Sequence, residues 1–335
     1  MIRVGSLGLR LLLVGVLTAL GSAVAAQGSY SEQPEVQAFM DEMVGDHGFE
    51  RSELESWFSE VSRSESVIER ISAPAERVLN WGEYRDIFVT DSRIEAGHRF
   101  IAQYNDDLQR AEEKTGVPLE LIAAIIGVET FYGRHRGTHG VLEALSTLAF
   151  DYPPRSNFFR SELEQYLLLV REQGFDPLEL KGSYAGAMGY GQFISSSYRH
   201  YAIDFDGDGV ADILDNPADA IGSVANYISE HNWRTGEPVV ERVQANESAR
   251  ERFHQDRLRP AFTVGQLREG GIELGAELSG EAPAKLITLE GRSGKEDWVG
   301  FHNFYVITRY NHSDLYAMAV YQLAQALSDQ DYAAQ

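Results

Sequence analysis

Aspartates alternate along one short stretch of this chain. They stand at Asp204, Asp206, Asp208, Asp212 and Asp215, which are positions 1, 3, 5, 9 and 12 of the stretch, and position 6 is a glycine. This is the oxygen-ligand pattern of an EF-hand loop, in which a tight turn aims alternate side chains at one Ca²⁺ ion. The stretch therefore predicts a calcium-binding loop with a structural role, which restricts how the chain folds around it.

The last ligand of this loop is open between two residues. An EF-hand loop normally ends on a bidentate glutamate at position 12, whereas this chain has the shorter Asp215 there and Asp219 just beyond. The expected metal ligands are Asp204, Asp206, Asp208, the carbonyl of Val210, and either Asp215 or Asp219. A solvated acidic turn is the alternative, because Asp-Gly pairs favour turns, but the number of matching positions favours a metal site.

The first residues have the form of an export signal. Arg3 and Arg10 precede an apolar run over residues 11–20, and an A-x-A cleavage site follows at residues 23–25. We therefore expect residues 1–26 to be a signal peptide and the protein to be periplasmic. The chain contains no cysteine, so we expect no disulfide and none of the lipid anchors that need a cysteine at the cleavage site. No membrane anchor is expected.

The formal net charge of the 335 residues is −22 at pH 7. A strongly acidic surface repels nucleic acid, so no nucleic-acid partner is expected. The chain also holds 16 tyrosines and 16 phenylalanines. Exposed aromatic rings suit the apolar faces of sugars, although most rings of this kind belong to the core of a protein.

The hydrophobic periodicity predicts an α+β fold that is mainly α. Amphipathic or apolar runs predict helices over residues 34–70, 94–114, 119–128, 156–172, 218–232 and 315–327. Residues 236–295 alternate in short runs that predict strands, and residues 299–309 look like one more strand. The expected domains are a helical domain over 27–112, a core over 113–235 with the acidic loop, a small β-rich domain over 236–295, and a return to the core over 296–335.

Glu129 follows the most apolar of these runs. Residues 119–128 are apolar nearly all round, so their helix should be buried. A carboxyl group beside such a helix is desolvated, which raises its pKa and lets it act as a general acid near neutral pH. An ordinary exposed glutamate at the helix end is the alternative. Glycoside cleavage usually needs two carboxylates, and Asp151 is the candidate second one, unless it caps the turn before Pro153.

The segment over residues 182–193 is the other candidate for a site. It holds Gly182, Gly186, Gly189 and Gly191, which allow the backbone to approach a ligand or another segment closely. Its tyrosines and Phe193 could stack on sugar, but a tightly packed turn between helices would have the same composition. Zinc-binding histidine spacings, a Walker signature and a G-x-S-x-G motif are all missing from the sequence.

Together these motifs resemble the B-type lytic murein transglycosylases, which share the fold of goose-type lysozyme. The resemblance rests on several blocks in the same order. They are Ile126 to Thr130, Leu148 to Pro153, Lys181 to Phe193, Asp204 to Tyr227, and Tyr310 to Ser313 with Tyr316. The resemblance covers most of the chain beyond the export signal, and without a cysteine this chain is similar to the soluble forms of the family. It implies a lysozyme-like core with an N-terminal helical domain and a small β-rich insert.

The resemblance also implies an activity and a set of site residues. Glu129 matches the single acid/base that cleaves the β-1,4 bond between N-acetylmuramic acid and N-acetylglucosamine in peptidoglycan, leaving 1,6-anhydromuramic ends. The matching substrate-binding residues are Ser183, Gln192, Arg155, Tyr227, Tyr310, Asn311 and Tyr316. Pro154 replaces the first residue of a basic pair that Arg155 completes. The calcium loop matches as well, and its alignment with the family favours Asp219 as the last ligand.

Two competing functions follow from the same residues. A lysozyme-like hydrolase on the same scaffold would use Asp151 to activate water. A catalytically silent peptidoglycan- or calcium-binding module would not need Glu129 beside an apolar helix. The expected partner is the glycan strand of peptidoglycan, and cell-wall synthases or amidases are further candidates. Because the chain is so acidic, the glycan should be held by the cleft rather than by charge alone.

Overall fold

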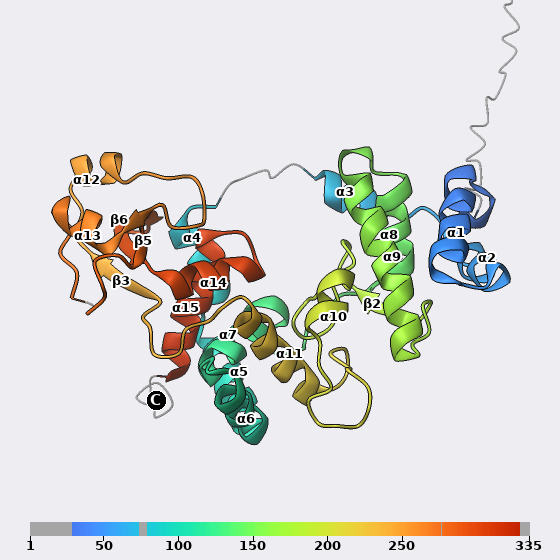
Figure 1. Ribbon diagram of the computed structural model, residues 1–335, viewed down its shortest axis with the longest axis horizontal. Helices are drawn as coiled ribbons and strands as arrows, with labels where there is room; N and C mark the ends of the chain where they lie inside the picture. The colour runs from blue at the N-terminus through green and yellow to red at the C-terminus, as the bar shows by residue number, and fades with distance from the viewer. Residues whose placement is uncertain (1–28, 74–78, 276, 329–335) are drawn as a thin grey trace, which may run out of the picture.

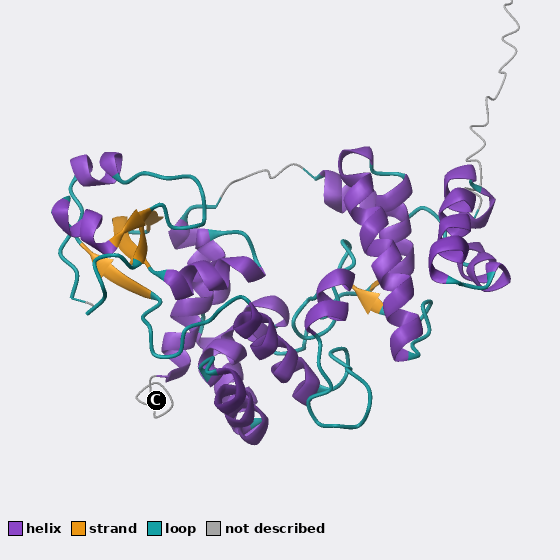
Figure 2. Ribbon diagram, viewed as in Figure 1, coloured by secondary structure: helices purple, strands orange, loops and turns teal. Residues whose placement is uncertain are grey.

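A computed structural model of the protein describes residues 29–73, 79–275 and 277–328, and the expected signal peptide lies outside them. Helices dominate the described residues, and the strands gather in one four-stranded sheet and one two-stranded ladder (Figure 2). The mainly helical class with a small β part is thus confirmed. No helix of the described residues is long and apolar enough to cross a membrane.

The helices and strands follow one another along the chain with short connections. The α-helices are α1 (Pro34–His47), α2 (Arg51–Ser59), α3 (Glu65–Ser72), α4 (Trp81–Phe88), α5 (Asp91–Gln103), α6 (Asn105–Thr115), α7 (Leu119–Thr130), α8 (Val141–Phe150), α9 (Ser156–Gln173), α10 (Ser195–Tyr201), α11 (Pro217–Glu230), α12 (Glu247–Arg252), α13 (Val264–Glu269), α14 (His302–Tyr310) and α15 (Asp314–Ser328). The strands are β1 (His139–Gly140), β2 (Lys181–Gly182), β3 (Val240–Val243), β4 (Phe262–Thr263), β5 (Pro283–Gly291) and β6 (Gly294–Gly300). Two short 3-10 helices are η1 (Tyr30–Glu32) and η2 (Pro153–Arg155).

The helices pack in two groups. In the first group, α8 lies alongside α9, α3 and α10 pack on this pair, and α1 and α2 pack together beside η1 (Figure 1). In the second group, α7 is surrounded by α5, α6, α11 and α15, and α14 fits between α11 and α15. The helices before residue 112 therefore serve both groups. The domain boundaries drawn from the sequence stay predictions.

The four-stranded sheet lies at one end of the molecule, beside α12 and α13 (Figure 1). Its strand order is β3-β6-β5-β4, and every neighbouring pair is antiparallel. The hairpin of β5 and β6 turns between Gly291 and Gly294, so β6 begins just before the boundary expected at residue 295. A separate apolar cluster that includes Phe253, Leu267 and Val299 gives this part of the chain a core of its own.

An ion pair whose lysine is buried joins the sheet to α15. Lys285 of β5 is only 3 % exposed, and its Nζ donates a hydrogen bond to the Asp314 carboxylate at the first turn of α15. A buried ammonium group is very costly without a partner of opposite charge. The pair therefore restricts how the sheet sits against the start of that helix.

The strand expected over residues 299–309 is wrong for most of its length. Strand β6 ends at Gly300, and the chain from His302 to Tyr310 forms helix α14. The β-branched run at residues 306–308 suggested a strand. The buried side chains Asn303, Phe304, Ile307 and Thr308 nevertheless recur at helical spacing, and the helix packs against α11 and α15. Tertiary packing decides over the weaker local preference.

The single helix expected over residues 94–114 is interrupted. Helix α5 ends and α6 begins at Tyr104, whose φ of −117° and ψ of 29° are not helical. The rings of Phe100 and Tyr104 lie 4.9 Å apart, and Phe100 also contacts Tyr132, with 5.4 Å between the ring centroids. This aromatic packing accompanies the bend, which amphipathic periodicity alone does not reveal.

Gly127 inside α7 allows another segment to approach. A Cβ built at this position would lie 2.6 Å from Tyr132 ring atoms, so we predict that Gly127→Ala destabilises the protein by about 1–3 kcal/mol through overpacking. Gly45 in α1 is the matched control, because a Cβ there meets nothing within 4 Å. Gly45→Ala should stabilise by roughly 0.5–1 kcal/mol through helix propensity. Urea unfolding of both variants measures this, and equal stabilisation by both would contradict the packing at Gly127.

Candidate active site

Glu129 lies at the end of α7, directly after a run of buried side chains from Leu121 to Val128. The side chain is partly exposed, but surrounding protein atoms desolvate its carboxyl group and raise its pKa to about 7. The hydroxyl of Tyr316, on α15, donates a hydrogen bond of 2.7 Å to Glu129 Oε1, which opposes this rise. The carboxyl group can therefore hold or release a proton near neutral pH.

The backbone after Glu129 turns sharply. Phe131 and Tyr132 have φ angles of 53° and 59°, a left-handed conformation that is costly for bulky side chains. Two contacts hold the turn in place. Arg93 Nε donates to the carbonyl of Gly127 at 3.1 Å, and its guanidinium lies 4.8 Å from the centroid of the Phe131 ring.

The glycine-rich segment is held against this turn and against α14. Thr130 Oγ1 donates to the carbonyl of Tyr190 at 2.9 Å. Tyr310 Oη donates to the carbonyl of Gly191 at 2.6 Å, and a Cβ at Gly191 would lie only 2.7 Å from that hydroxyl. Glycine is required at this position because any larger residue would displace the tyrosine.

Two expected substrate-binding residues lie in the same segment. The backbone N–H groups of Ala185 and Ala187 donate to Ser183 Oγ, which closes the turn after β2. Gln192 has a φ of 51°, and its Nε2 donates to the carbonyls of Gly189 and Arg136. Both side chains thus shape the segment that packs against the end of α7.

Three of the expected tyrosines form a series of rings that starts at Glu129. The rings of Tyr316 and Tyr310 are parallel to within 7°, with centroids 6.4 Å apart. The ring of Tyr227 follows at 4.8 Å from that of Tyr310, and its hydroxyl donates to the carbonyl of Arg309. Asn311 lies next, at the exposed C-terminal end of α14. The structure therefore brings Tyr227, Tyr310 and Tyr316 together on the side of Glu129.

Two other residues lie elsewhere. Arg155 ends η2 before α9, where its guanidinium stacks over the rings of Phe158 and Phe159. Asp151 follows α8 and accepts a hydrogen bond from Tyr30, and Arg63 lies 3.5 Å from its other oxygen. Asp151 thus joins the N-terminal helices to α8.

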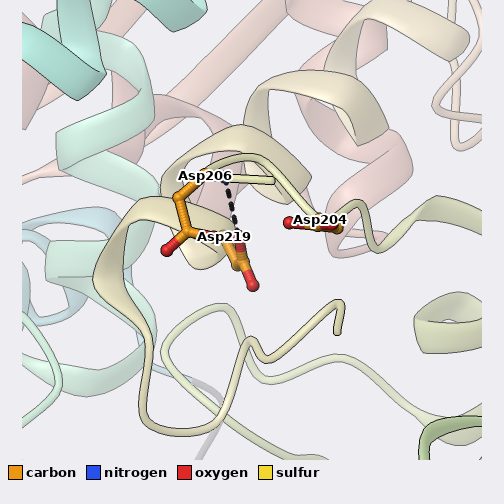
Figure 3. Close-up of side chains that lie close together, drawn as sticks. All are labelled: Asp204, Asp206 and Asp219. Carbon is orange, nitrogen blue, oxygen red and sulfur yellow. Dashed lines mark hydrogen bonds between the residues drawn. The ribbon is translucent and has the colours of Figure 1, made fainter. Parts of the chain in front are cut away.

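The acidic loop connects α10 to α11. Carboxylate oxygens of Asp204, Asp206 and Asp219 lie within 4.8 Å of one another (Figure 3). Asp219 is fully buried, and it accepts hydrogen bonds from the backbone of Phe205, Asp206 and Asp212. Burial raises the pKa of Asp219.

The other expected ligands belong to the same loop, between Asp204 and Asp219. Gly209, at position 6 of the loop, has a φ of 99°, a value that glycine adopts readily. Asp208 accepts a hydrogen bond from the backbone N–H of Val210. Asp215 points away from the cluster, because its side chain pairs with Arg136 at 2.8 Å and is 80 % exposed.

Several contacts at the site carry no signal in the sequence. Burial raises the pKa of Tyr84 of α4, and the negative charge of nearby Glu129 adds to this rise. Arg93 and Tyr132 shape the turn after α7. These residues act through segments that are distant in sequence, so only the fold reveals them.

Comparisons with known proteins agree with this architecture. Residues 31–325 match the Transglycosylase SLT domain family. The chain is 44% identical over 310 residues to membrane-bound lytic murein transglycosylase B of Escherichia coli (strain K12), a match that covers 90% of this chain and 84% of that protein. The chain therefore belongs to the family of the SLT transglycosylase domain.

Solved structures show the same relationship. The catenated lytic transglycosylase SltB1 from Pseudomonas aeruginosa is 51% identical with a TM-score of 0.86, covering 89% of this chain and 98% of that one. The Escherichia coli lytic transglycosylase Slt35 in complex with calcium is 43% identical with a TM-score of 0.83, covering 90% and 95%. SltB3 from Pseudomonas aeruginosa in complex with NAG-NAM-pentapeptide is 29% identical with a TM-score of 0.80, covering 88% and 79%. The lysozyme-like fold and the family expected from the sequence are confirmed.

The hydrogen bond from Tyr316 should keep the pKa of Glu129 lower than burial alone would make it. We predict that Tyr316→Phe raises this pKa above its value of about 7, because the lost donor stabilised the carboxylate form. Carbon-13 NMR of the glutamate carboxyl groups against pH measures the midpoint. Tyr321→Phe is the matched control on the same helix and should leave it unchanged. A midpoint that falls in Tyr316→Phe would contradict the assignment of this bond.

Proposed function

We propose that the chain is a lytic transglycosylase that cleaves the β-1,4 bond between N-acetylmuramic acid and N-acetylglucosamine in peptidoglycan. Family membership supports the class of reaction. The observation that carries the assignment of the residue is the carboxyl group of Glu129, whose pKa of about 7 lets it serve first as an acid and then as a base.

The reaction needs only this one carboxyl group. Protonated Glu129 donates its proton to the glycosidic oxygen while the bond from C1 to that oxygen breaks. The 6-hydroxyl of the same muramic acid then attacks C1 and gives its proton to the Glu129 carboxylate, which closes a 1,6-anhydro ring. The glutamate returns to its starting state, and water does not enter the product. The acetamido group of the muramic acid supplies the stabilisation of C1 that a second carboxylate would otherwise give.

The position of Asp151 argues against hydrolysis. A lysozyme-type hydrolase would need a second carboxylate to activate water, and Asp151 was the candidate in the sequence. Its oxygens instead face Tyr30 of η1 and Arg63 of the loop between α2 and α3. A catalytically silent binding module is also disfavoured, because such a protein has no use for a desolvated carboxyl group with a hydrogen-bond donor.

The aromatic series beside Glu129 supports a glycan-binding cleft. We assign Tyr227, Tyr310 and Tyr316 to sugar contact and to positioning of the acid, since their rings follow one another away from it. Ser183, Gln192 and Asn311 are further candidates from neighbouring segments. Arg155, on the separate α8–α9 pair, would reach only a distal part of the polymer.

Peptidoglycan is the proposed partner, and the periplasm is the proposed location. SltB3, a relative of this chain, binds NAG-NAM-pentapeptide, which is a fragment with the chemistry of that polymer. The location rests on the export signal expected over residues 1–26. Association with cell-wall synthases or amidases stays a prediction.

We also propose that the acidic loop binds a structural Ca²⁺ ion. The donors fit a hard cation, because Asp204, Asp206 and Asp219 gather carboxylate oxygens within 4.8 Å. Slt35, which is similar over 90% of this chain, is known in complex with calcium. Asp208 and the Val210 carbonyl would complete the ligand set. The ion would hold the loop against α11, and no catalytic step depends on it.

Glu129→Gln tests the acid/base. We expect digestion of isolated sacculi to fall by about 10²–10⁴-fold, the usual contribution of a general acid or base. Mass spectrometry of the fragments from wild-type protein should show anhydro ends rather than reducing ends. Reducing ends would establish hydrolysis instead, and full activity of the variant would remove Glu129 from the reaction.

The fold of this variant can be checked through its stability. The pKa of Glu129 is raised from 4.5 to about 7 in the folded protein, so its contribution to stability falls as pH rises through that range. Glu129→Gln should therefore stabilise the protein at pH 8 by on the order of 2 kcal/mol, and much less at pH 4. Such a gain would exclude misfolding as the cause of lost activity.

Calcium should raise the melting temperature, because a ligand that binds only the folded state stabilises it. We expect the difference between millimolar Ca²⁺ and chelator to disappear in Asp219→Asn, whose parent side chain belongs to the cluster. Asp215→Asn should keep it, since Asp215 pairs with Arg136 instead. Differential scanning calorimetry measures both. If Asp215→Asn removed the difference and Asp219→Asn kept it, the ligand would be Asp215, at position 12 of the loop.

A further inference from the structure

A cavity of about 600 Å³ lies beside the tyrosine series. It is lined by Tyr227, whose ring contacts that of Tyr310. Its lining comes from α9, α10, α11 and α14. The proton transfers proposed for Glu129 do not involve this cavity. The cavity shares Tyr227 with the tyrosine series that starts at Glu129.

The side chains of the cavity combine a cation with aromatic rings. The ring of Tyr227 lies 4.6 Å from that of Tyr201 and 4.3 Å from that of His231, measured between centroids. Arg309 and Arg199 also line the cavity, and its lining contains no aspartate or glutamate. The chain has a formal net charge of −22, so a lining with arginines and without carboxylates differs in charge from the average surface.

The two arginines differ in their partners. Arg199 donates two hydrogen bonds to the carboxylate of Glu172, so its charge is already balanced. Among the described residues, the guanidinium of Arg309 has one hydrogen-bond partner, Nε2 of His312 at 3.1 Å, and no carboxylate pairs with it. Burial raises the pKa of Tyr227 to about 12 and lowers that of His231; the positive charge of Arg309 opposes the first shift and adds to the second, so it acts on two groups that line the same cavity. Arg309 is therefore the cation of this cavity that is available to a ligand.

We propose that this cavity binds a carboxylate of the peptide stem that peptidoglycan carries, with Arg309 as the anchoring residue. The inference rests on the proposed function and extends it to the part of the substrate that is not sugar. A guanidinium matches a carboxylate with two parallel hydrogen bonds, and the adjoining rings offer apolar contact for the aliphatic part of a peptide. Arg309 directly precedes Tyr310 in α14, so the proposed anchor lies next to the tyrosine series that leads away from Glu129.

The test compares two substrates. One is the glycan strand with its peptide stems, and the other is the same strand after an amidase has removed them. We expect Arg309→Gln to lower kcat/KM on the peptide-bearing strand about tenfold, mainly through KM, and to leave kcat/KM on the stripped strand unchanged. Arg309→Lys should recover part of the loss, since it keeps the charge but not the paired hydrogen bonds. The loss should shrink at high salt, because exposed charges are screened.

Arg252→Gln is the matched control, because it removes the same charge from an exposed position on α12 of the β-rich part. It should leave both substrates unaffected. Equal loss on both substrates in Arg309→Gln would mean that this arginine supports the neighbouring Tyr310, and would overturn the proposal. No loss on either substrate would overturn it as well.

Failure of this proposal is separable from failure of the proposed function. Formation of anhydro ends from the stripped strand by the wild-type protein tests the reaction at Glu129 without any peptide. A direct measurement uses the Glu129→Gln protein, which should not turn over its ligand. Calorimetric titration should show NAG-NAM-pentapeptide binding about tenfold more tightly than NAG-NAM, and Arg309→Gln should remove the difference. If the Glu129→Gln protein with Arg309 intact bound both ligands with equal affinity, the proposed peptide site would be contradicted.

Discussion

The packing of α7 against α15 is the contact on which the site depends. Helix α7 is buried from Leu121 to Val128, so its position is fixed by the core around it. The same contact desolvates Glu129 and brings the hydroxyl of Tyr316 to 2.7 Å from its carboxylate. Burial and the hydrogen bond act on the pKa in opposite directions. In the proposed reaction, their balance near neutral pH would allow one carboxyl group to serve in both proton transfers.

The sequence predicts those parts of the site that depend on neighbouring residues. The apolar run before Glu129 and the spacing of Asp204 and Asp206 are local patterns, and the fold places both as expected. Contacts between segments that are distant in the sequence do not follow from such local patterns. Nothing near Asp151 in the sequence shows that Tyr30 and Arg63 occupy its oxygens.

Helix α14 illustrates the same limit in the fold. Its β-branched residues favour a strand locally, yet its buried side chains follow the helical period that α11 and α15 require. The last ligand of the proposed calcium site is a second case. Position 12 of the loop suggested Asp215, but that side chain has a partner in Arg136, while Asp219 is buried among the other acids. In each case the deciding partner comes from elsewhere in the chain.

Charge is the remaining constraint, because an enzyme with a net charge of −22 has to bind a polymer that is itself anionic. Screening at physiological ionic strength limits the reach of exposed charges to about 8 Å, so the repulsion from distant acids is weak at the cleft. What matters there is the charge within that distance. Arg199, which lines the cavity beside the tyrosine series, is paired with Glu172. Arg309 lines the same cavity without a carboxylate partner among the described residues, so in the proposed binding mode it would decide which part of the substrate enters.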